Sequence, residues 1–138
     1  MPLMSKRIRP RPKPPSPEQI RDRRLAAGLT QSQAAALVYV ETQGWRRYES
    51  GTASPRPAIW RLFCLRVEAG EFAPREAGPT PSPVVIRRKR EAGGLTQLQA
   101  ADTVGVSLQS WQRYESGEHA PNAAVWALFC ALSERRAL

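Results

Sequence analysis

The stretch Thr30–Pro55, TQSQAAALVYVETQGWRRYESGTASP, is repeated as Thr96–Pro121, TQLQAADTVGVSLQSWQRYESGEHAP. The copies lie 66 residues apart and align without a gap. Extended to residues 16–68 and 82–134, the alignment contains 29 identical residues in 53 positions. The chain of 138 residues therefore contains one small unit twice. Each unit is close to the lower size limit for a hydrophobic core that folds alone, so each has to be compact.

Each copy begins with a signal for the start of a helix. Thr30 is followed three residues later by Gln33, and Thr96 by Gln99, and both pairs have the capping-box pattern. Small apolar residues follow in both copies and allow a second helix to approach closely. The pattern predicts a helix, a tight turn and another helix.

The turn differs between the copies. Gly105–Ser107 is favourable, because glycine adopts the left-handed conformation easily and serine can cap the next helix. The first copy has Tyr39–Glu41 instead. We expect a strained left-handed backbone at Tyr39, and we expect Thr42 rather than Glu41 to cap the helix that follows.

The helices after the turn are predicted at Thr42–Ser50 and Leu108–Ser116, and Gly51 and Gly117 end them. A tryptophan and a tyrosine three positions apart in each helix should face the core. The residues left on the outer face are Thr42, Gln43, Arg46 and Arg47 in the first copy and Leu108, Gln109, Gln112 and Arg113 in the second.

Two more helices complete each unit. Ser16 with Gln19, and Ser82 in the second copy, predict the start of a first helix that ends at a glycine. A last helix is expected to begin at Pro55 and at Pro121. Its apolar stripe is predicted to be core and comprises Trp60, Phe63, Cys64 and Val67, with Trp126, Phe129 and Cys130 in the second copy. The two cysteines are interpreted as buried thiols in a reducing compartment, rather than as a disulfide, metal ligands or a nucleophile.

These elements predict an all-α chain with two tandem compact four-helix domains at 16–69 and 82–138. Residues 70–81 are rich in glycine and proline and are interpreted as a linker. Residues 1–15 are interpreted as a disordered basic tail.

The formal net charge of +9 indicates a polyanionic partner. The tail contributes more than half of it, through Lys6, Arg7, Arg9, Arg11 and Lys13. This tail is either an arm that contacts DNA phosphates or the minor groove, or a solvated extension that aids solubility. The sequence has neither an apolar run long enough to span a membrane nor the pattern of a secretory signal, which favours a cytoplasmic protein of a bacterial cell or its nucleoid.

The phrase GLTQ…A…V.V….W.RYESG..P, present twice, resembles the helix-turn-helix domain of the lambda-repressor and Cro family over about 105 residues. The last helix also resembles that of small regulators of transposable phages. The chain departs from the family pattern at Tyr39, where a glycine is usual, and in lacking the fifth helix that often forms the dimer contact.

The resemblance implies roles for the outward residues. Gln31 and Gln97 would bond a phosphate at the start of the second helix. Gln43 and Gln109 would read adenine, Arg47 and Arg113 would read guanine, and Thr42 and Leu108 could contact a thymine methyl. Arg46 and Gln112 lie at the edge, where phosphate and base contacts both remain open. A merely solvated polar face is the alternative for the whole set.

The resemblance also implies two structural ion pairs, Arg24 with Glu49 and Arg90 with Glu115. An enzyme is not expected, because the sequence has no phosphate-binding glycine loop, no metal-ligand spacing and no nucleophile beside a base. The single histidine, His119, lies in a loop and is matched by Ala53 in the first copy. No cofactor and no metal are predicted.

The sequence thus predicts a transcriptional regulator that binds specific double-stranded DNA, as a repressor that could regulate its own gene. The two domains would act as a covalent pseudo-dimer, with the third helices in successive major grooves. Three alternatives remain open: a protein-interaction scaffold built on this fold, a division of labour with one DNA-reading copy and one assembly copy, and a homodimer or complex with another protein.

Overall fold

A computed structural model describes residues 13–73 and 76–137, with side chains described up to residue 134. The described residues form eight α-helices and separate into two compact units, residues 13–78 and the residues from Pro79 onward. We call these the N-terminal unit and the C-terminal unit. The division between Gly78 and Pro79 falls inside the glycine- and proline-rich segment 70–81.

Each unit contains four helices. The N-terminal unit has α1 (Pro17–Ala26), α2 (Gln31–Leu37), α3 (Thr42–Ser50) and α4 (Pro57–Glu68). The C-terminal unit has α5 (Pro83–Ala92), α6 (Gln97–Val104), α7 (Leu108–Ser116) and α8 (Ala123–Ala137). The predicted all-α class with two four-helix domains is confirmed.

Helix starts follow the local capping signals. The capping boxes at Ser16, Thr30 and Thr96 are all formed, with the side chain and the backbone of each cap both bonded. Ser107 caps α7, because its Oγ accepts a hydrogen bond from the Ser110 N–H at 3.0 Å. The prediction for Thr42 is wrong: it is the first residue of α3, and Glu41 occupies the cap position without a side-chain bond.

The last helices begin two residues later than predicted. Arg56 is extended and precedes Pro57, which is the first residue of α4. A residue before proline avoids the helical conformation, so the helix cannot include Arg56. In the C-terminal unit Asn122 Oδ1 accepts from the Val125 N–H at 2.8 Å and so satisfies the start of α8.

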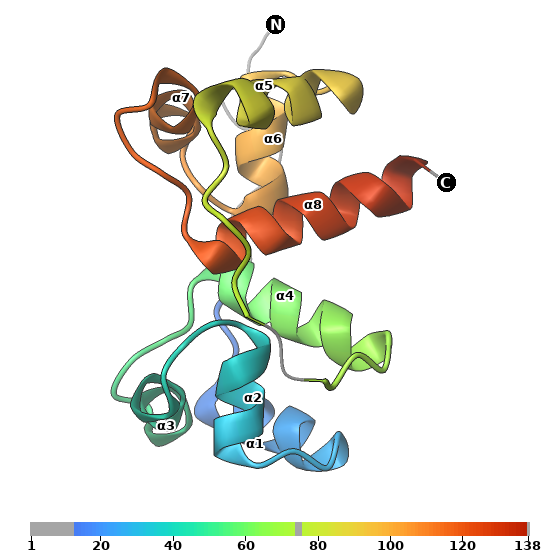
Figure 1. Cartoon of the computed structure of the whole chain (residues 1–138). Coiled ribbons are helices and arrows are strands. Elements are labelled where there is room, and N and C mark those ends of the chain that lie inside the picture. Colours follow the sequence, from blue (N-terminus) through green and yellow to red (C-terminus); the bar gives the residue numbers. More distant parts are fainter. Residues whose placement is uncertain (1–12, 74–75, 138) are drawn as a thin grey trace, which may run out of the picture. The chain divides into compact units, whose positions relative to one another are not determined.

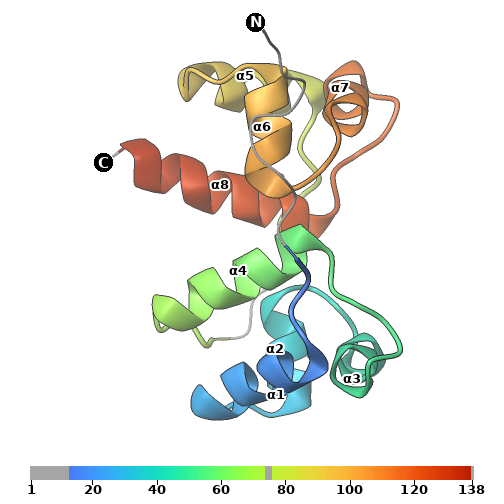
Figure 2. The same ribbon diagram turned by 180° about the vertical axis from the view of Figure 1, so that it is seen from behind.

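Each core is centred on a tryptophan. Trp45 and Trp111 are fully buried, and their rings lie 4.8 Å from Phe63 and 4.9 Å from Phe129 between centroids. This packing holds α3 against α4, and α7 against α8. Figures 1 and 2 show that α2 and α3 cross steeply at their turn, as do α6 and α7.

The predicted core stripe of the last helix is only partly correct. Phe63 is buried, but Trp60, Cys64 and Val67 are half-buried at the edge. The buried face is rotated toward Ile59, Leu62, Phe63 and Arg66. The prediction placed the large side chain of Trp60 in the core, whereas the smaller aliphatic side chains of Ile59 and Leu62 fill it.

Both cysteines are free and half-buried rather than fully buried. Burial raises the pKa of the Cys64 and Cys130 thiols, so both are poor nucleophiles near neutral pH.

Candidate nucleic-acid interface

Helix α3 presents different chemistry on its two faces. Trp45 faces the core and is fully buried, while Gln43, Arg46 and Arg47 are exposed. Thr42, at the start of the helix, is half-buried. The outer face of α3 is therefore polar and cationic, and its orientation is set by the buried tryptophan.

Helix α7 repeats this arrangement with a different outer face. Gln109 and Gln112 are exposed, and Leu108 is 38% exposed despite being apolar. Arg113 is partly exposed. The outer face of α7 therefore combines two side-chain amides with one exposed apolar side chain.

A buried carboxylate joins the first three helices of the N-terminal unit. The guanidinium of Arg24 on α1 donates to Glu49 on α3 through Nε at 2.6 Å and Nη2 at 2.9 Å. Trp45 Nε1 donates to the same carboxylate at 2.6 Å, and Gln31 Nε2 on α2 donates at 3.1 Å. The two charged side chains are only 11% and 7% exposed.

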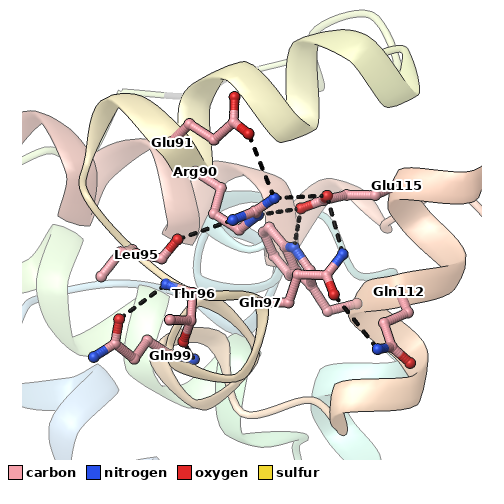
Figure 3. Close-up of polar contacts among 9 residues, drawn as sticks. Arg90, Glu91, Leu95, Thr96, Gln97, Gln99, Gln112 and Glu115 are labelled. Atoms are coloured by element: carbon pink, nitrogen blue, oxygen red, sulfur yellow. Dashed lines mark hydrogen bonds and ion pairs between the residues drawn. The ribbon is translucent and has the colours of Figure 1, made fainter.

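The C-terminal unit has the same network around Glu115, drawn in Figure 3. Arg90 donates to this carboxylate at 2.5 and 3.1 Å, Trp111 Nε1 at 2.6 Å and Gln97 Nε2 at 3.1 Å. The Arg90 Nη1 group also donates to the carbonyl of Leu95 at 3.0 Å. Each network thus fixes the inner side of one outward-facing helix.

The two carboxylates are held ionised. Burial raises the pKa of Glu49, but the hydrogen bonds from Arg24, Trp45 and Gln31 outweigh this effect and lower it below its ordinary value. The same balance lowers the pKa of Glu115. Because each carboxylate is committed to donors inside its own unit, neither is placed to act as a catalytic base.

The two glutamines that the sequence predicts to contact phosphate each bond a buried carboxylate. Gln31 and Gln97 are the first residues of α2 and α6, and each uses one amide N–H on the buried carboxylate. This bond fixes which way the amide points, so that its oxygen faces away from the carboxylate. The sequence pattern alone did not reveal this role.

One hydrogen bond in this region occurs only in the second copy. Gln112 Nε2 donates to Gln97 Oε1 at 3.4 Å, which links the outer face of α7 to the buried Glu115 network (Figure 3). The equivalent of Gln112 in the N-terminal unit is the exposed Arg46. The signal for this difference was present in the sequence as a Gln-to-Arg exchange between the copies.

The charge around the two outer faces also differs. Residues 40–57 contain three arginines and two glutamates, a net +1, whereas residues 106–123 contain one arginine and two glutamates, a net −1. Glu118 lies 3.8 Å from the Arg113 guanidinium, and the matching residue in the first copy is the uncharged Thr52. Both partners of this ion pair are well exposed, so its contribution is small.

The basic arm falls almost entirely outside the described residues, which include only Lys13 of its five basic residues; Lys13 is exposed. Lys6, Arg7, Arg9 and Arg11 lie in the part that is not described. His119 is exposed.

The described residues contain no group of three or more His, Cys, Asp or Glu side chains that could hold a metal ion. Within the same ranges no helix combines the length and the apolar character needed to cross a membrane.

Sequence reasoning missed Arg66, which is buried on α4 and contacts the turn between α2 and α3. The signal was a pair of exchanges between the copies: Tyr39 and Arg66 in the first correspond to Gly105 and Leu132 in the second.

Comparison with known families matches this geometry. A family model described as a helix-turn-helix domain matches residues 18–71 and, separately, residues 84–135. The chain belongs to the helix-turn-helix domain family. The match confirms the resemblance to the lambda-repressor and Cro type, and it confirms that the chain carries two tandem copies. Comparison with curated proteins gives no match.

Membership of this family suggests DNA as the partner of both helix-turn-helix domains, and domains of this kind are typically non-catalytic. In each domain the second helix of the motif is the one that commonly enters the major groove. Those helices are α3 and α7, the same two that the buried networks fix from the inside.

Proposed function

We propose that the chain is a transcriptional regulator that binds a specific site on double-stranded DNA through α3 and α7. The observation that carries the proposal is the pairing of a fixed inner face with a polar outer face in both helices. A side chain discriminates between bases only if the helix that bears it is held in a defined orientation. The buried carboxylate networks supply that orientation.

In the N-terminal unit the proposed contacts are strongly cationic. Gln43 would pair with adenine and Arg47 with guanine, and Thr42 would touch a thymine methyl group. Arg46 would contact phosphate, because the net charge on this side is positive. The amide of Gln31 would contact a phosphate at the start of α2.

In the C-terminal unit we propose more contacts with bases and fewer with phosphates than in the N-terminal unit, because the region around α7 has less positive charge. Gln109 would read adenine, Arg113 guanine, and Leu108 a thymine methyl group. The bond to Gln97 leaves Gln112 with its amide oxygen and one N–H available, the pair of groups that adenine N6 and N7 require. Gln112 is therefore assigned to a base, although Arg46 at the same position is assigned to phosphate.

The two units would act together as a covalent pseudo-dimer on one DNA molecule, with domains 16–69 and 82–138 joined by residues 70–81. Twelve residues span at most roughly 40 Å when extended. Two major grooves on one face of DNA are about 34 Å apart, so the linker is long enough for both units to bind in succession. Repression, including of its own gene, would follow if the site overlaps a promoter.

Selection of binding sites from random duplex DNA tests this function. Because the outer faces of α3 and α7 differ, the two half-sites of the recovered site should differ in sequence. The whole site should then be asymmetric or a direct repeat, and not a perfect palindrome. Arg47→Ala should relax sequence preference in one half-site, and Arg113→Ala in the other, each by about 1–3 kcal/mol of discrimination. Arg23→Ala is a matched control, because Arg23 carries the same charge but is paired with Glu68 on α4.

Two results would contradict the proposal. Recovery of one symmetric motif would show that the two faces are not read separately. Unchanged DNA binding in the double variant Arg47→Ala/Arg113→Ala would favour a protein-interaction scaffold instead.

A further inference from the structure

Arg66 is a charged side chain inside a very small domain. It lies on α4 and is only 6% exposed. Burial of an arginine is costly unless its donors are satisfied. Its contacts therefore indicate what the N-terminal unit uses it for.

Three contacts of the Arg66 guanidinium are made with the end of α2 and the turn that follows it. Arg66 Nη1 donates to the carbonyl of Leu37, the last residue of α2. Its Nη2 donates to the Tyr39 hydroxyl at 3.0 Å, and the guanidinium carbon lies 5.2 Å from the centre of the Tyr39 ring. A cation at that distance from an aromatic ring is attracted to it.

The turn needs this support because of its backbone. Tyr39 has a φ of 62°, and among the described residues other than glycine it is the only one with a positive φ. A side chain other than glycine is strained there. The carbonyl of Leu37 is also one of those that the end of a helix leaves without a partner inside the helix.

The equivalent turn of the C-terminal unit has the same left-handed backbone but a different residue. Gly105 occupies the equivalent position with a φ of 72°, a conformation that glycine adopts without strain. The residue equivalent to Arg66 is Leu132. The two positions have therefore changed together: a glycine turn goes with a leucine, and a tyrosine turn goes with an arginine.

The start of α3 also lacks a restraint that α7 has. Ser107 caps α7 through its hydroxyl, whereas Glu41 makes no side-chain capping bond to α3. Thr42 and Gln43 follow this uncapped residue directly. The positions of Thr42 and Gln43 therefore depend on the backbone of the turn. Arg66 on α4 stabilises that turn through its bonds to Leu37 and Tyr39.

We propose that Arg66 is a positioning residue for DNA reading by α3, acting through the Leu37 carbonyl and the Tyr39 side chain. It does not touch DNA. It sets the direction in which α3 leaves the turn, and so where the Thr42 and Gln43 side chains stand. This inference rests on the proposed function of α3.

The test compares Arg66→Leu with the double variant Tyr39→Gly/Arg66→Leu. The double variant gives the N-terminal unit the glycine and leucine that the C-terminal unit has at the equivalent positions, Gly105 and Leu132. Two quantities are measured in the full chain. One is hydrogen exchange of the Val40 amide, which donates to the Ala35 carbonyl at 3.1 Å, and of the Trp45 amide, which donates to the Glu41 carbonyl at 3.1 Å. The other is affinity for duplexes in which one half-site at a time is altered. Exchange of the equivalent Val106 and Trp111 amides is the internal control.

Arg66→Leu should speed exchange of the Val40 and Trp45 amides and weaken binding that depends on the first half-site by about ten-fold. Dependence on the second half-site should stay unchanged, and the double variant should restore most of both losses. Arg66→Lys should recover little, because an ammonium group cannot reproduce the two-sided contact of the guanidinium.

The proposal is overturned if Arg66→Leu leaves exchange and first half-site affinity as in the wild type, if it weakens both half-sites equally, or if the double variant does no better. Failure of the proposed function is distinguishable, because the wild-type chain would then bind no duplex, or its binding would be unchanged in Arg47→Ala/Arg113→Ala. The role of Arg66 in DNA reading falls in that case, and hydrogen exchange tests what is left of the inference, the support of the turn. Faster exchange confined to the turn and reversed in Tyr39→Gly/Arg66→Leu supports that part, and unchanged exchange refutes it.

Discussion

Replacement of Glu49 by glutamine should nearly unfold the N-terminal unit. The change removes the counter-charge of Arg24, which is 11% exposed, and places an amide N–H against donors from Arg24 and Trp45. Loss of one partner from a buried ion pair costs about 3–5 kcal/mol. A domain the size of residues 18–71 has a total stability of roughly 3–8 kcal/mol, at 0.05–0.15 kcal/mol per residue. The cost is therefore comparable to the whole free energy of unfolding.

Urea unfolding followed by tryptophan fluorescence measures this effect, because each unit has its own buried tryptophan, Trp45 or Trp111. Glu49→Gln should shift one transition to low urea and leave the other, and Glu115→Gln should do the reverse. Glu118→Gln is the matched control: Glu118 is in an exposed pair, so its loss should cost below about 1 kcal/mol.

The double variant Arg24→Met/Glu49→Leu separates the cost of a lone buried charge from the value of the pair. If the lone charge dominates, the double variant should be more stable than Glu49→Gln, because both charges are removed together. The reasoning is refuted if Glu49→Gln changes the free energy of unfolding by no more than Glu118→Gln does.

Three further predictions concern charge, pH and the turn. Arg46→Gln should lower the slope of log affinity against log salt concentration by about 1, because one phosphate contact is lost. Titrations at several salt concentrations measure this slope, and an unchanged slope would show that Arg46 does not contact a phosphate. The lowered pKa of Glu49 and Glu115 contributes stability that is complete above their ordinary value of 4.5 and is lost as pH falls below it, so thermal stability should drop on acidification. Arg24→Met/Glu49→Leu, which removes both charges, should flatten that drop in its own unit, and an equally steep drop in this variant would contradict the prediction. Gly105→Tyr should destabilise the C-terminal unit by about 1–3 kcal/mol in urea unfolding, because that unit has a leucine where Arg66 would be needed; a neutral effect would mean that the turn tolerates tyrosine unaided.

Much of the architecture was predictable because its signals are local. A capping box such as Thr30 with Gln33 spans four residues, and the left-handed backbone at Tyr39 was expected from comparison of the two turns. The bounds of α3 and α7 also follow from short-range patterns and a terminal glycine. The repeat strengthened the signals that both copies share, such as the capping boxes at Thr30 and Thr96 and the glycines that end α3 and α7.

Other features depended on residues far apart in the chain. The face of α4 that is buried was predicted incorrectly at Trp60 and Val67, because helical periodicity gives a stripe but the partner helices decide which stripe packs best. The use of the Gln31 amide on Glu49 required two helices to meet.

The sequence by itself determined that the chain is all-helical, that it contains two copies of a helix-turn-helix domain, and which side chains of α3 and α7 lie outward. The two copies follow from the alignment at an offset of 66 residues, and the helices and their outer faces follow from patterns of residues three or four positions apart. Only the tertiary structure decided how those helices are held. Arg66 and Tyr39 are 27 positions apart, and Gln31 and Glu49 are 18 apart. Such contacts arise only when the chain has folded back on itself and excluded water from the donors and acceptors that remain.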